Sequence, residues 1–362
     1  MNVLIKPAGA ACNLACAYCF YCQLAKQRQV KSCQFLAWSD MAAFLDAAFK
    51  RAIPQLNLTF QGGEPTLRGL DFYRQVVSYV KEKSPASMRV NYAIQSNASL
   101  IDRAWARFLR DEEFLVGISL DGPPAIHDRY RRSHTGQASF EAVWSGIEAL
   151  RAEQVSFNIL TVVHRDLAVA IDEVYAFYRE AGFEYQQYIA CLDPIGDRGA
   201  AAWSLSPEVY GDFLIRLFDL WFDELCAGHY RSIGFFDQLI LLLRGQLPTV
   251  CGMLGVCTAQ YVIEADASVY PCDFYCSDAY LLGSIHDGLE RLDERRRALQ
   301  FLESSYALPP KCQRCRYLQV CRGQCRRQRD DGAELGLNYF CRAYQRFFDA
   351  CFERLLLCAK RL

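Results

Sequence analysis

The stretch Cys12-Asn-Leu-Ala-Cys16-Ala-Tyr-Cys19 decides the fold of this chain, because it carries three thiols at CxxxCxxC spacing. It follows the first apolar run, Val3–Lys6, so the thiols are expected in the loop after the first strand. Three thiolates this close together can hold three irons of a cubane cluster and leave the fourth iron without a protein ligand. A zinc site would need a fourth ligand, and none of the five histidines is near in sequence. The spacing therefore favours an iron–sulfur cluster with one open iron.

Alternating strands and helices flank this motif. Six apolar runs have the length and residue types of buried strands, and amphipathic stretches between them predict helices. The predicted strands are Val3–Lys6, Asn57–Gln61, Val90–Gln95, Leu115–Leu120, Phe157–Val163 and Tyr185–Ile189. The predicted helices begin near Ser39, Leu70, Ile101, Ala138 and Leu167, and Ser39 and Asp102 have the side chains of helix-start residues.

This order of elements predicts the fold class and the division of the chain. Six βα units in a row predict an α/β fold with a parallel sheet. The length favours a partial (β/α)6 TIM-like barrel, because a complete eight-unit barrel takes about 250 residues. After Asp193-Pro-Ile-Gly the rhythm changes, and residues 205–228 predict one long amphipathic helix. We expect four parts: the barrel (1–195), a bridging helical segment (196–250), a C-terminal cysteine-rich auxiliary domain (251–341) with a hairpin near Gln260–Tyr270, and a final helix (342–362).

Composition limits the classes of partner. The 362 residues carry a formal net charge of −1, which gives no long-range attraction to nucleic acid or to anionic lipid. No apolar run reaches the 18 or so residues of a membrane-spanning helix, and Pro7 leaves too little room for the apolar stretch of a signal peptide. We therefore expect a cytoplasmic protein that binds neither nucleic acid nor membranes.

Cysteine is over-represented: the chain has 18, and none lies between Cys33 and Cys191. Disulfide frameworks belong to small exported domains, so clustered thiols in a reducing compartment indicate metal binding. Eight downstream thiols suffice for two fully ligated four-iron clusters. Two structural zinc sites are the alternative, because four thiolates suit zinc equally well. The downstream thiols are Cys251, Cys257, Cys272, Cys312, Cys315, Cys321, Cys325 and Cys341.

The first motif, in its place after the first strand, resembles the signature of the radical S-adenosylmethionine (SAM) superfamily, with Cys12, Cys16 and Cys19 binding a [4Fe-4S] cluster. The sequence Phe60-Gln-Gly-Gly-Glu64-Pro ends the second predicted strand and resembles the GGE motif of that superfamily. This resemblance implies that Glu64 contacts the amino group of bound SAM, while the two glycines allow a close backbone approach. A strand-ending Gly-Gly is by itself more often only a turn.

Further strand ends supply the other cofactor contacts that the resemblance implies. In related enzymes the positions of Asn97, Ser119 and Asp121 contact the cofactor carboxylate and ribose, and those of Tyr18 and Leu192 frame the adenine. The three polar residues follow strands, where barrel active sites are built, but each could instead cap the next helix. The expected cofactor-binding residues are Tyr18, Tyr21, Gly62, Gly63, Glu64, Asn97, Ser119, Asp121 and Leu192.

The downstream thiols resemble the SPASM auxiliary-cluster domain. This resemblance implies two more [4Fe-4S] clusters, three in all. Cys276 is close enough to Cys272 in the sequence to be an alternative ligand. Arginines among these thiols either offset the negative charge of the clusters or are plain surface charge. The implied ligand sets are Cys251, Cys257, Cys272 and Cys325 for one cluster, and Cys312, Cys315, Cys321 and Cys341 for the other.

Phrases along the whole chain resemble the anaerobic sulfatase-maturating enzymes, among them LIKPAGAACNLACAYCFY, FQGGEPTL, QYIACLDP and YPCDFY. That family oxidises Cys or Ser in a Cys/Ser-x-Pro-x-Arg motif of a sulfatase to formylglycine, by hydrogen abstraction with a 5′-deoxyadenosyl radical. The resemblance implies a sulfatase or peptide substrate and an electron donor such as flavodoxin or ferredoxin. Two departures are visible, since Ala98 and Ala267 stand where the family usually has glycine. At Ala267 a turn thereby loses a residue that tolerates positive φ.

The same resemblance places the general base at Asp273, directly after Cys272. Removing a proton from the substrate makes the Cβ-centred species easier to oxidise, so a base beside an auxiliary cluster couples deprotonation to electron departure. Alternatively, Asp273 caps a turn or pairs with an arginine. In that case Tyr21 and Tyr188 are the next candidates for the base.

Two other functions remain open from the sequence. A radical SAM peptide maturase would form thioether or carbon–carbon crosslinks, but such enzymes often carry an extra N-terminal recognition module, and this chain begins close to its first strand. A non-catalytic iron–sulfur electron carrier would need neither the GGEP motif nor an open iron. The sequence does not decide between a Cys and a Ser target.

Overall fold

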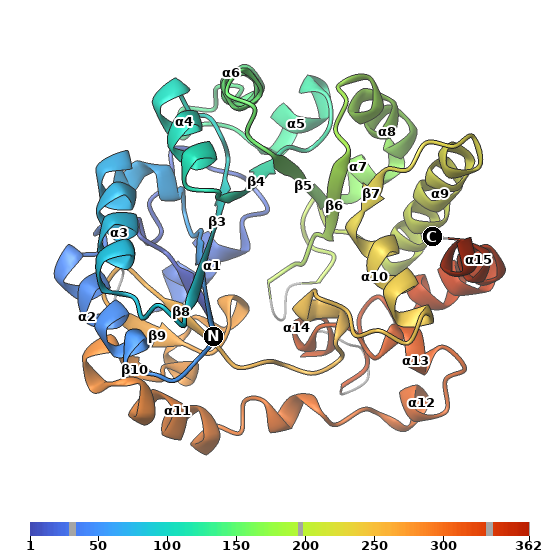
Figure 1. The fold of residues 1–362 in the computed structure, drawn as a ribbon. Coiled ribbons are helices and arrows are strands. Elements are labelled where there is room, and N and C mark those ends of the chain that lie inside the picture. The colour runs from blue at the N-terminus through green and yellow to red at the C-terminus, as the bar shows by residue number, and fades with distance from the viewer. Residues whose placement is uncertain (29–33, 195–197, 331–335, 362) are drawn as a thin grey trace. The chain divides into compact units, whose positions relative to one another are not determined.

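The computed structural model describes residues 1–28, 34–194, 198–330 and 336–361 (Figure 1). The chain forms two compact units. Unit one comprises Met1–Ser119, Asp128–Phe157 and Ala259–Phe301, and unit two comprises Leu120–His127, Asn158–Thr258 and Leu302–Leu362. Across the described ranges, no helix combines the length and the apolarity that a bilayer crossing requires.

Unit one is built on a mainly parallel sheet, in which strand β1 is central. Each of the pairs β1–β2, β2–β3 and β3–β4 is parallel, as expected for successive βα units. The strands of this series are β1 (Asn2–Ile5), β2 (Gln55–Phe60), β3 (Arg89–Ser96) and β4 (Leu115–Ser119). Its helices are α1 (Phe20–Gln27), α2 (Trp38–Phe49), α3 (Leu70–Lys83), α4 (Arg103–Asp111) and α6 (Phe140–Ala152), and α5 (Pro124–Tyr130) crosses the division between the units.

A hairpin from late in the chain extends the sheet of unit one. Strands β8 (Gln260–Ile263) and β9 (Ser268–Tyr270) are antiparallel, which confirms the hairpin expected near Gln260–Tyr270. Strand β8 also pairs in parallel with β1, on the edge opposite β2, and β10 (Gly283–Ser284) joins β9. Helix α11 (Leu289–Ala298) follows. The loop after β1 and the loop after β9 therefore belong to one compact unit.

Unit two holds the three strands β5 (Phe157–Val163), β6 (Tyr185–Ala190) and β7 (Ser232–Ile233), which are parallel. Long helices α9 (Pro207–Cys226) and α15 (Cys341–Arg361) pack together through aromatic side chains; the rings of Phe218 and Phe347 lie 5.9 Å apart. The other helices are α7 (Arg165–Val169), α8 (Ile171–Glu180), α10 (Gly234–Leu243), α12 (Pro310–Gln313), α13 (Leu318–Cys321) and α14 (Arg326–Asp330).

The predicted mixed α/β class with successive parallel strands and a cysteine-rich C-terminal region is confirmed. Asp102 caps α4 as predicted, since its carboxylate accepts the Trp105 N–H at 2.9 Å. The prediction for Ser39 is wrong: Ala37 is the cap residue of α2, and Ser39 lies inside the first turn. Trp38 joins the helix there and packs edge-on against Tyr79, so the helix starts earlier than the cap signal indicates. The four-part division of the chain stays a prediction.

Candidate active site

The loop between β1 and α1 carries Cys12, Cys16 and Cys19, and Cys19 occupies the cap position of α1. The three thiols interact electrostatically, and burial together with these neighbours raises the pKa of Cys12 to about 12. A hydrogen bond with Cys22 lowers the pKa of Cys19 to about 6, with a smaller contribution from Arg131. Cys22, which the CxxxCxxC motif does not include, is thus a fourth thiol in contact with this group.

One histidine, His134, reaches this loop, and its Nε2 lies 2.9 Å from the carbonyl oxygen of Cys12. Within the described ranges, no three His, Cys, Asp or Glu side chains are grouped to chelate a single metal ion. Three neighbouring thiols in one loop provide the ligands that a four-iron cluster with an open iron requires.

The GGE segment packs directly against the cluster loop. Gly63 N–H donates to the carbonyl of Gly9 at 2.9 Å, and Glu64 N–H donates to the carbonyl of Ala11 at 2.8 Å. A Cβ atom on Gly63 would lie 2.0 Å from the oxygen of Ala11, so only glycine fits. Gly62 has φ of +123°, which also favours glycine. In this structure the close approach of the glycines is to the loop that carries Cys12.

Glu64 is buried, and both carboxylate oxygens accept hydrogen bonds. Oε1 accepts from Ser96 Oγ at 2.8 Å and from Thr66 Oγ1 at 2.5 Å, and Oε2 accepts from the Asn97 N–H at 2.8 Å. Burial raises the pKa of Glu64 above its usual value, although these bonds act in the opposite direction. Four hydrogen bonds fix the position of this carboxylate at the ends of β2 and β3.

Asn97 connects Glu64 to the cluster loop. Its Nδ2 donates to Asn13 Oδ1 at 2.9 Å and lies 3.9 Å from Cys12 Sγ. Nearby in unit one, Tyr18 is buried and its hydroxyl accepts a hydrogen bond from Arg131 at 3.1 Å. Ser119 is the last residue of β4 and is partly exposed. The structure thus groups the cluster thiols with a carboxylate and an amide, a donor set that suits a cluster-bound amino acid.

Two expected cofactor residues belong to unit two. The Oδ1 atom of Asp121 accepts the Val162 N–H at 2.9 Å, so this buried carboxylate holds the backbone of β5. Leu192 follows β6 and is half-buried. Their cofactor roles stay predictions.

The downstream thiols of unit two form two groups. Cys312, Cys315, Cys321 and Cys341 line one pocket, with Tyr317, Tyr344 and Phe348 as neighbours. Burial and the other three thiols raise the pKa of Cys321 to about 12. In the second group, burial, opposed by a backbone hydrogen bond, raises the pKa of Cys325 to about 11, and Cys251 and Cys257 contribute to this rise. Their members are residues of the two ligand sets that the SPASM resemblance implies, whereas Cys272 belongs to unit one. These ligand roles stay predictions.

Several arginines among these thiols have a structural role. Arg329 is buried and donates to the carbonyl oxygens of Ser305 at 2.7 Å and Gly255 at 3.3 Å. Arg322 donates to the carbonyl of Leu254 at 2.8 Å. These guanidinium groups therefore hold the backbone of the loop that ends at Cys257.

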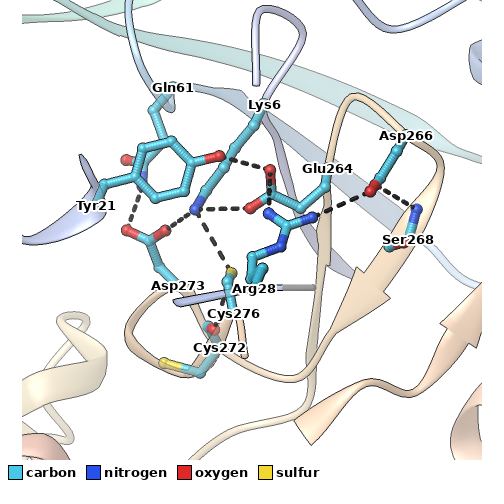
Figure 2. Close-up of polar contacts among 10 residues, drawn as sticks. All are labelled: Lys6, Tyr21, Arg28, Gln61, Glu264, Asp266, Ser268, Cys272, Asp273 and Cys276. Atoms are coloured by element: carbon cyan, nitrogen blue, oxygen red, sulfur yellow. Dashed lines mark hydrogen bonds and ion pairs between the residues drawn. The ribbon is translucent and has the colours of Figure 1, made fainter. Parts of the chain in front are cut away.

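Asp273, the expected base, begins a short 3₁₀ helix, Asp273–Tyr275, after β9. One carboxylate oxygen forms an ion pair with Lys6 Nζ at 2.6 Å, and the other accepts a hydrogen bond from Gln61 Nε2 at 2.7 Å (Figure 2). Its side chain is 16% exposed, whereas that of Lys6 is fully buried. Sequence reasoning missed Lys6; the available signal was a lysine closing an apolar strand, since lysine is almost never fully buried unless it is paired.

Cys276, the alternative ligand, is also fully buried. Its Sγ accepts a hydrogen bond from Lys6 at 3.5 Å and lies 3.6 Å from the carbonyl oxygen of Cys272 (Figure 2). It packs with Val262 and Tyr270 in a small core cluster, as buried free cysteines commonly do.

Comparison with known proteins supplies the family. A Radical SAM superfamily model matches residues 7–177. The chain is 40% identical to the cysteine-type anaerobic sulfatase-maturating enzyme of Clostridium novyi over all of this chain and 98% of that one. It is 32% identical to the serine-type enzyme of Bacteroides thetaiotaomicron over 96% of this chain and 88% of that one.

Comparison with solved structures indicates the same family. The chain superposes on native anSMEcpe with bound AdoMet with a TM-score of 0.94, at 38% identity over 99% of both chains. Streptococcus suis SuiB bound to its precursor peptide SuiA gives a TM-score of 0.64 at 15% identity, over 94% of this chain and 75% of that one, and shares the fold alone. The full-length sequence identity and the superposition lead to one conclusion: the chain belongs to the anaerobic sulfatase-maturating enzymes of the radical SAM superfamily.

Proposed function

We propose that this protein oxidises a Cys or Ser side chain in a Cys/Ser-x-Pro-x-Arg motif of a sulfatase to formylglycine. The observation that carries this proposal is the end-to-end identity of 40% with a cysteine-type anaerobic sulfatase-maturating enzyme. Membership in the superfamily implies one [4Fe-4S] cluster and SAM. The finer proposal is that the chain binds three such clusters, because two further groups of thiols lie downstream.

The residues have distinct tasks in this proposal. Cys12, Cys16 and Cys19 hold the SAM-binding cluster, and Glu64 and Asn97 bind the amino-acid end of SAM, supported by their places beside Cys12. The remaining cofactor contacts are Tyr18, Tyr21, Gly62, Gly63, Ser119, Asp121 and Leu192. The auxiliary ligands are Cys251, Cys257, Cys272 and Cys325 for one cluster, and Cys312, Cys315, Cys321 and Cys341 for the other. When bound, these cofactors supply hydrogen-atom abstraction from the substrate Cβ and an acceptor for the second electron.

Asp273 is the proposed general base, which takes the thiol or hydroxyl proton of the substrate. Two contacts support it: Lys6 and Gln61 each hold one carboxylate oxygen, so the group has one orientation. Its partial exposure, 16%, lets a substrate reach it. A positioned base of this kind contributes roughly 10²–10⁴-fold to the rate.

The proposed partners are a sulfatase peptide and a one-electron donor such as flavodoxin or ferredoxin, in the cytoplasm and without nucleic acid or a membrane. The structure of anSMEcpe with bound AdoMet and the Cp18Cys peptide supports a peptide as substrate. Higher identity to cysteine-type relatives (37–40%) than to serine-type relatives (30–32%) favours Cys as the target.

Paired peptides test this proposal. Anaerobically reconstituted protein, SAM and dithionite are mixed with a peptide containing Cys-x-Pro-x-Arg or its Ser counterpart, and the products are identified by mass spectrometry. We expect formylglycine, faster from the Cys peptide. A thioether or carbon–carbon crosslink would support the peptide maturase instead. Absence of any 5′-deoxyadenosine would support the non-catalytic electron carrier.

A further inference from the structure

Lys6 lies where three segments of unit one meet. It directly follows β1, its N–H donates to the carbonyl of Ile263 at the end of β8 (2.8 Å), and its carbonyl accepts the Gly9 N–H (3.0 Å). A Cβ atom on Gly62 would lie 2.9 Å from Lys6 Cβ, so the GGE segment packs against it as well. The backbone of Lys6 is therefore held by the cluster loop and by the β8–β9 hairpin.

The ammonium group of Lys6 is enclosed by four partners. Nζ lies 2.6 Å from Asp273 Oδ1, 3.2 Å from Glu264 Oε1, 3.5 Å from Cys276 Sγ and 3.5 Å from the ring centroid of Tyr21 (Figure 2). Burial alone would lower the pKa of Lys6, but Asp273, Cys276 and Glu264 together outweigh burial and raise it well above its usual value. The side chain is a permanent buried cation.

Glu264 anchors this cation from the side opposite the proposed base. Its Oε2 accepts a 2.5 Å hydrogen bond from the Tyr21 hydroxyl and pairs with Arg28 at 3.1 Å, and Arg28 pairs in turn with Asp266 at 3.1 Å. Burial would raise the pKa of Glu264, but Lys6, Arg28 and Tyr21 lower it below its usual value. Glu264 therefore stays a fixed anion.

The network of Arg28, Glu264, Lys6 and Asp273 is buried at one end and partly exposed at the other. Lys6 and Glu264 are 0% exposed and the Arg28 side chain is 2% exposed, while Asp273 is 16% exposed. Burying an ammonium ion without partners is very unfavourable, so the inner groups hold Lys6, and Lys6 holds the outer carboxylate. If Asp273 turned its Oδ1 away, buried Lys6 would lose its shortest contact, at 2.6 Å, and keep the longer ion pair with Glu264, at 3.2 Å.

We infer that Lys6 is a positioning residue for the oxidation step, which orients the Asp273 carboxylate toward the substrate and is itself held in place by Glu264. This inference rests on the proposed role of Asp273 as the base. A displacement of about 1 Å at a reacting group can cost on the order of a hundredfold in rate. Loss of Lys6 therefore uncouples SAM cleavage from formylglycine formation. SAM is still cleaved, but fewer cleavage events end in formylglycine.

The test is the ratio of formylglycine to 5′-deoxyadenosine in the reconstituted enzyme with a Cys-x-Pro-x-Arg peptide. For Lys6→Met we expect this ratio to fall on the order of tenfold or more, with the peptide KM close to that of the wild type. Lys6→Arg, which keeps a cation beside Asp273, should recover much of the ratio. A wild-type ratio in Lys6→Met would overturn the inference.

Arg296 provides a matched control. It is also buried in unit one, pairs with Asp293 at 2.7 Å and lies 4.5 Å from the ring centroid of Tyr261. Arg296→Met removes an equivalent cation at a distance from the base, so stability should fall while the ratio stays at the wild-type value. Equal uncoupling in this variant would show a general packing effect and overturn the inference.

A second variant covers the case in which Lys6→Met does not fold. Glu264→Gln keeps the Lys6 and Asp273 side chains but removes the carboxylate that holds Lys6. It should lower the ratio about two- to fivefold, less than the full effect of a misplaced base. An unchanged ratio would contradict the inference. If the wild-type protein makes 5′-deoxyadenosine but no formylglycine, the proposed function fails. If the wild-type protein makes formylglycine and the variants keep its ratio of formylglycine to 5′-deoxyadenosine, only the inference about Lys6 fails.

Discussion

Gly63 and Ala11 are in such close contact that a Cβ atom on Gly63 would lie 2.0 Å from the Ala11 carbonyl oxygen. The contact joins the GGE segment to the residue directly before Cys12, and it is reinforced by the Glu64 N–H, which donates to the same carbonyl at 2.8 Å. The geometry of the cluster loop therefore depends on the absence of a side chain at Gly63.

Gly63→Ala should displace the cluster loop. We expect iron to fall from about twelve to about eight atoms per chain, as loss of one four-iron cluster requires, and SAM cleavage to fall with it. Iron analysis and 5′-deoxyadenosine formation measure both effects. Gly69→Ala is the control for a methyl group added in the same segment, because no atom lies within 4 Å of the Gly69 Cβ position; Gly69 has positive φ (+84°), whereas Gly63 does not. Similar losses in both variants would mean that general destabilisation of this segment, not the clash with Ala11, is responsible.

Replacing Cys12, Cys16 and Cys19 together by Ala should also leave about eight irons per chain and abolish SAM cleavage, because the two downstream groups of thiols stay intact. Iron content and 5′-deoxyadenosine report the result. The exposed Cys226, at the end of α9, supplies a control substitution that should change neither quantity. SAM cleavage that persists in the triple variant would contradict the assignment of these three thiols to the SAM-binding cluster.

Asp273→Asn keeps the shape of the side chain and removes its basicity. Clusters and SAM cleavage should be retained, and formylglycine formation should fall about a hundredfold or more. Asp266→Asn is a matched control, because Asp266 belongs to the same network but pairs with Arg28 rather than Lys6. Near-normal formylglycine from the Asp273→Asn variant would make Asp273 structural.

Tyr21 and Tyr188 are weak substitutes for that base. Burial is the main cause that raises the pKa of each phenol above its usual value. A buried phenol that stays protonated cannot accept a proton from the substrate. The structure thus favours Asp273 over both alternatives on physical grounds.

Ala267 occupies the turn between β8 and β9 with φ of +65°, so the hairpin keeps the left-handed turn despite the alanine. That conformation costs an L-residue such as alanine about 1–2 kcal/mol. Glycine avoids this cost, but it has an entropy cost of about 0.5–1 kcal/mol and loses the burial of one methyl group, about 0.8 kcal/mol. The two sides roughly cancel. Ala267→Gly should therefore leave the thermal unfolding temperature unchanged or slightly higher, and the β-branched Ala267→Val should lower it.

Ala48→Gly, in the buried interior of helix α2, is the comparison. It should destabilise by about 1 kcal/mol from helix propensity alone. If Ala267→Gly destabilises as much as Ala48→Gly, the positive φ at Ala267 carries no strain. Ala98, with φ of +61°, has the same backbone conformation and should behave alike.

Local signals account for what the sequence predicted correctly. The βα series follows from apolar runs separated by amphipathic stretches, and the strand Phe157–Val163 has the predicted bounds. The CxxxCxxC thiols follow from spacing within one short segment, whereas the two downstream ligand sets are implied by the resemblance to the SPASM domain and stay predictions. The helix expected near Ser39 begins one residue earlier, at Trp38, so Ser39 lies in the first turn and is not the cap.

Contacts between distant segments carry no local signal and were not predicted. The pairing of β8 with β1 places Glu264 beside Lys6. A lysine that closes an apolar strand indicates a buried pair, but nothing in the sequence identifies Glu264 as its partner. The same holds for the Gln61 amide, which reaches Asp273 from the end of β2. Such a network becomes visible only once the sheet has been assembled.

Transfer of deuterium from the peptide to 5′-deoxyadenosine is the direct test of hydrogen abstraction from the target Cβ. The reconstituted enzyme is given SAM, dithionite and a Cys-x-Pro-x-Arg peptide whose target Cβ carries deuterium. If the enzyme abstracts hydrogen from the target Cβ, 5′-deoxyadenosine acquires deuterium while the peptide gains formylglycine. Unlabelled 5′-deoxyadenosine, or labelled 5′-deoxyadenosine with a crosslinked peptide and no formylglycine, would contradict the proposed function.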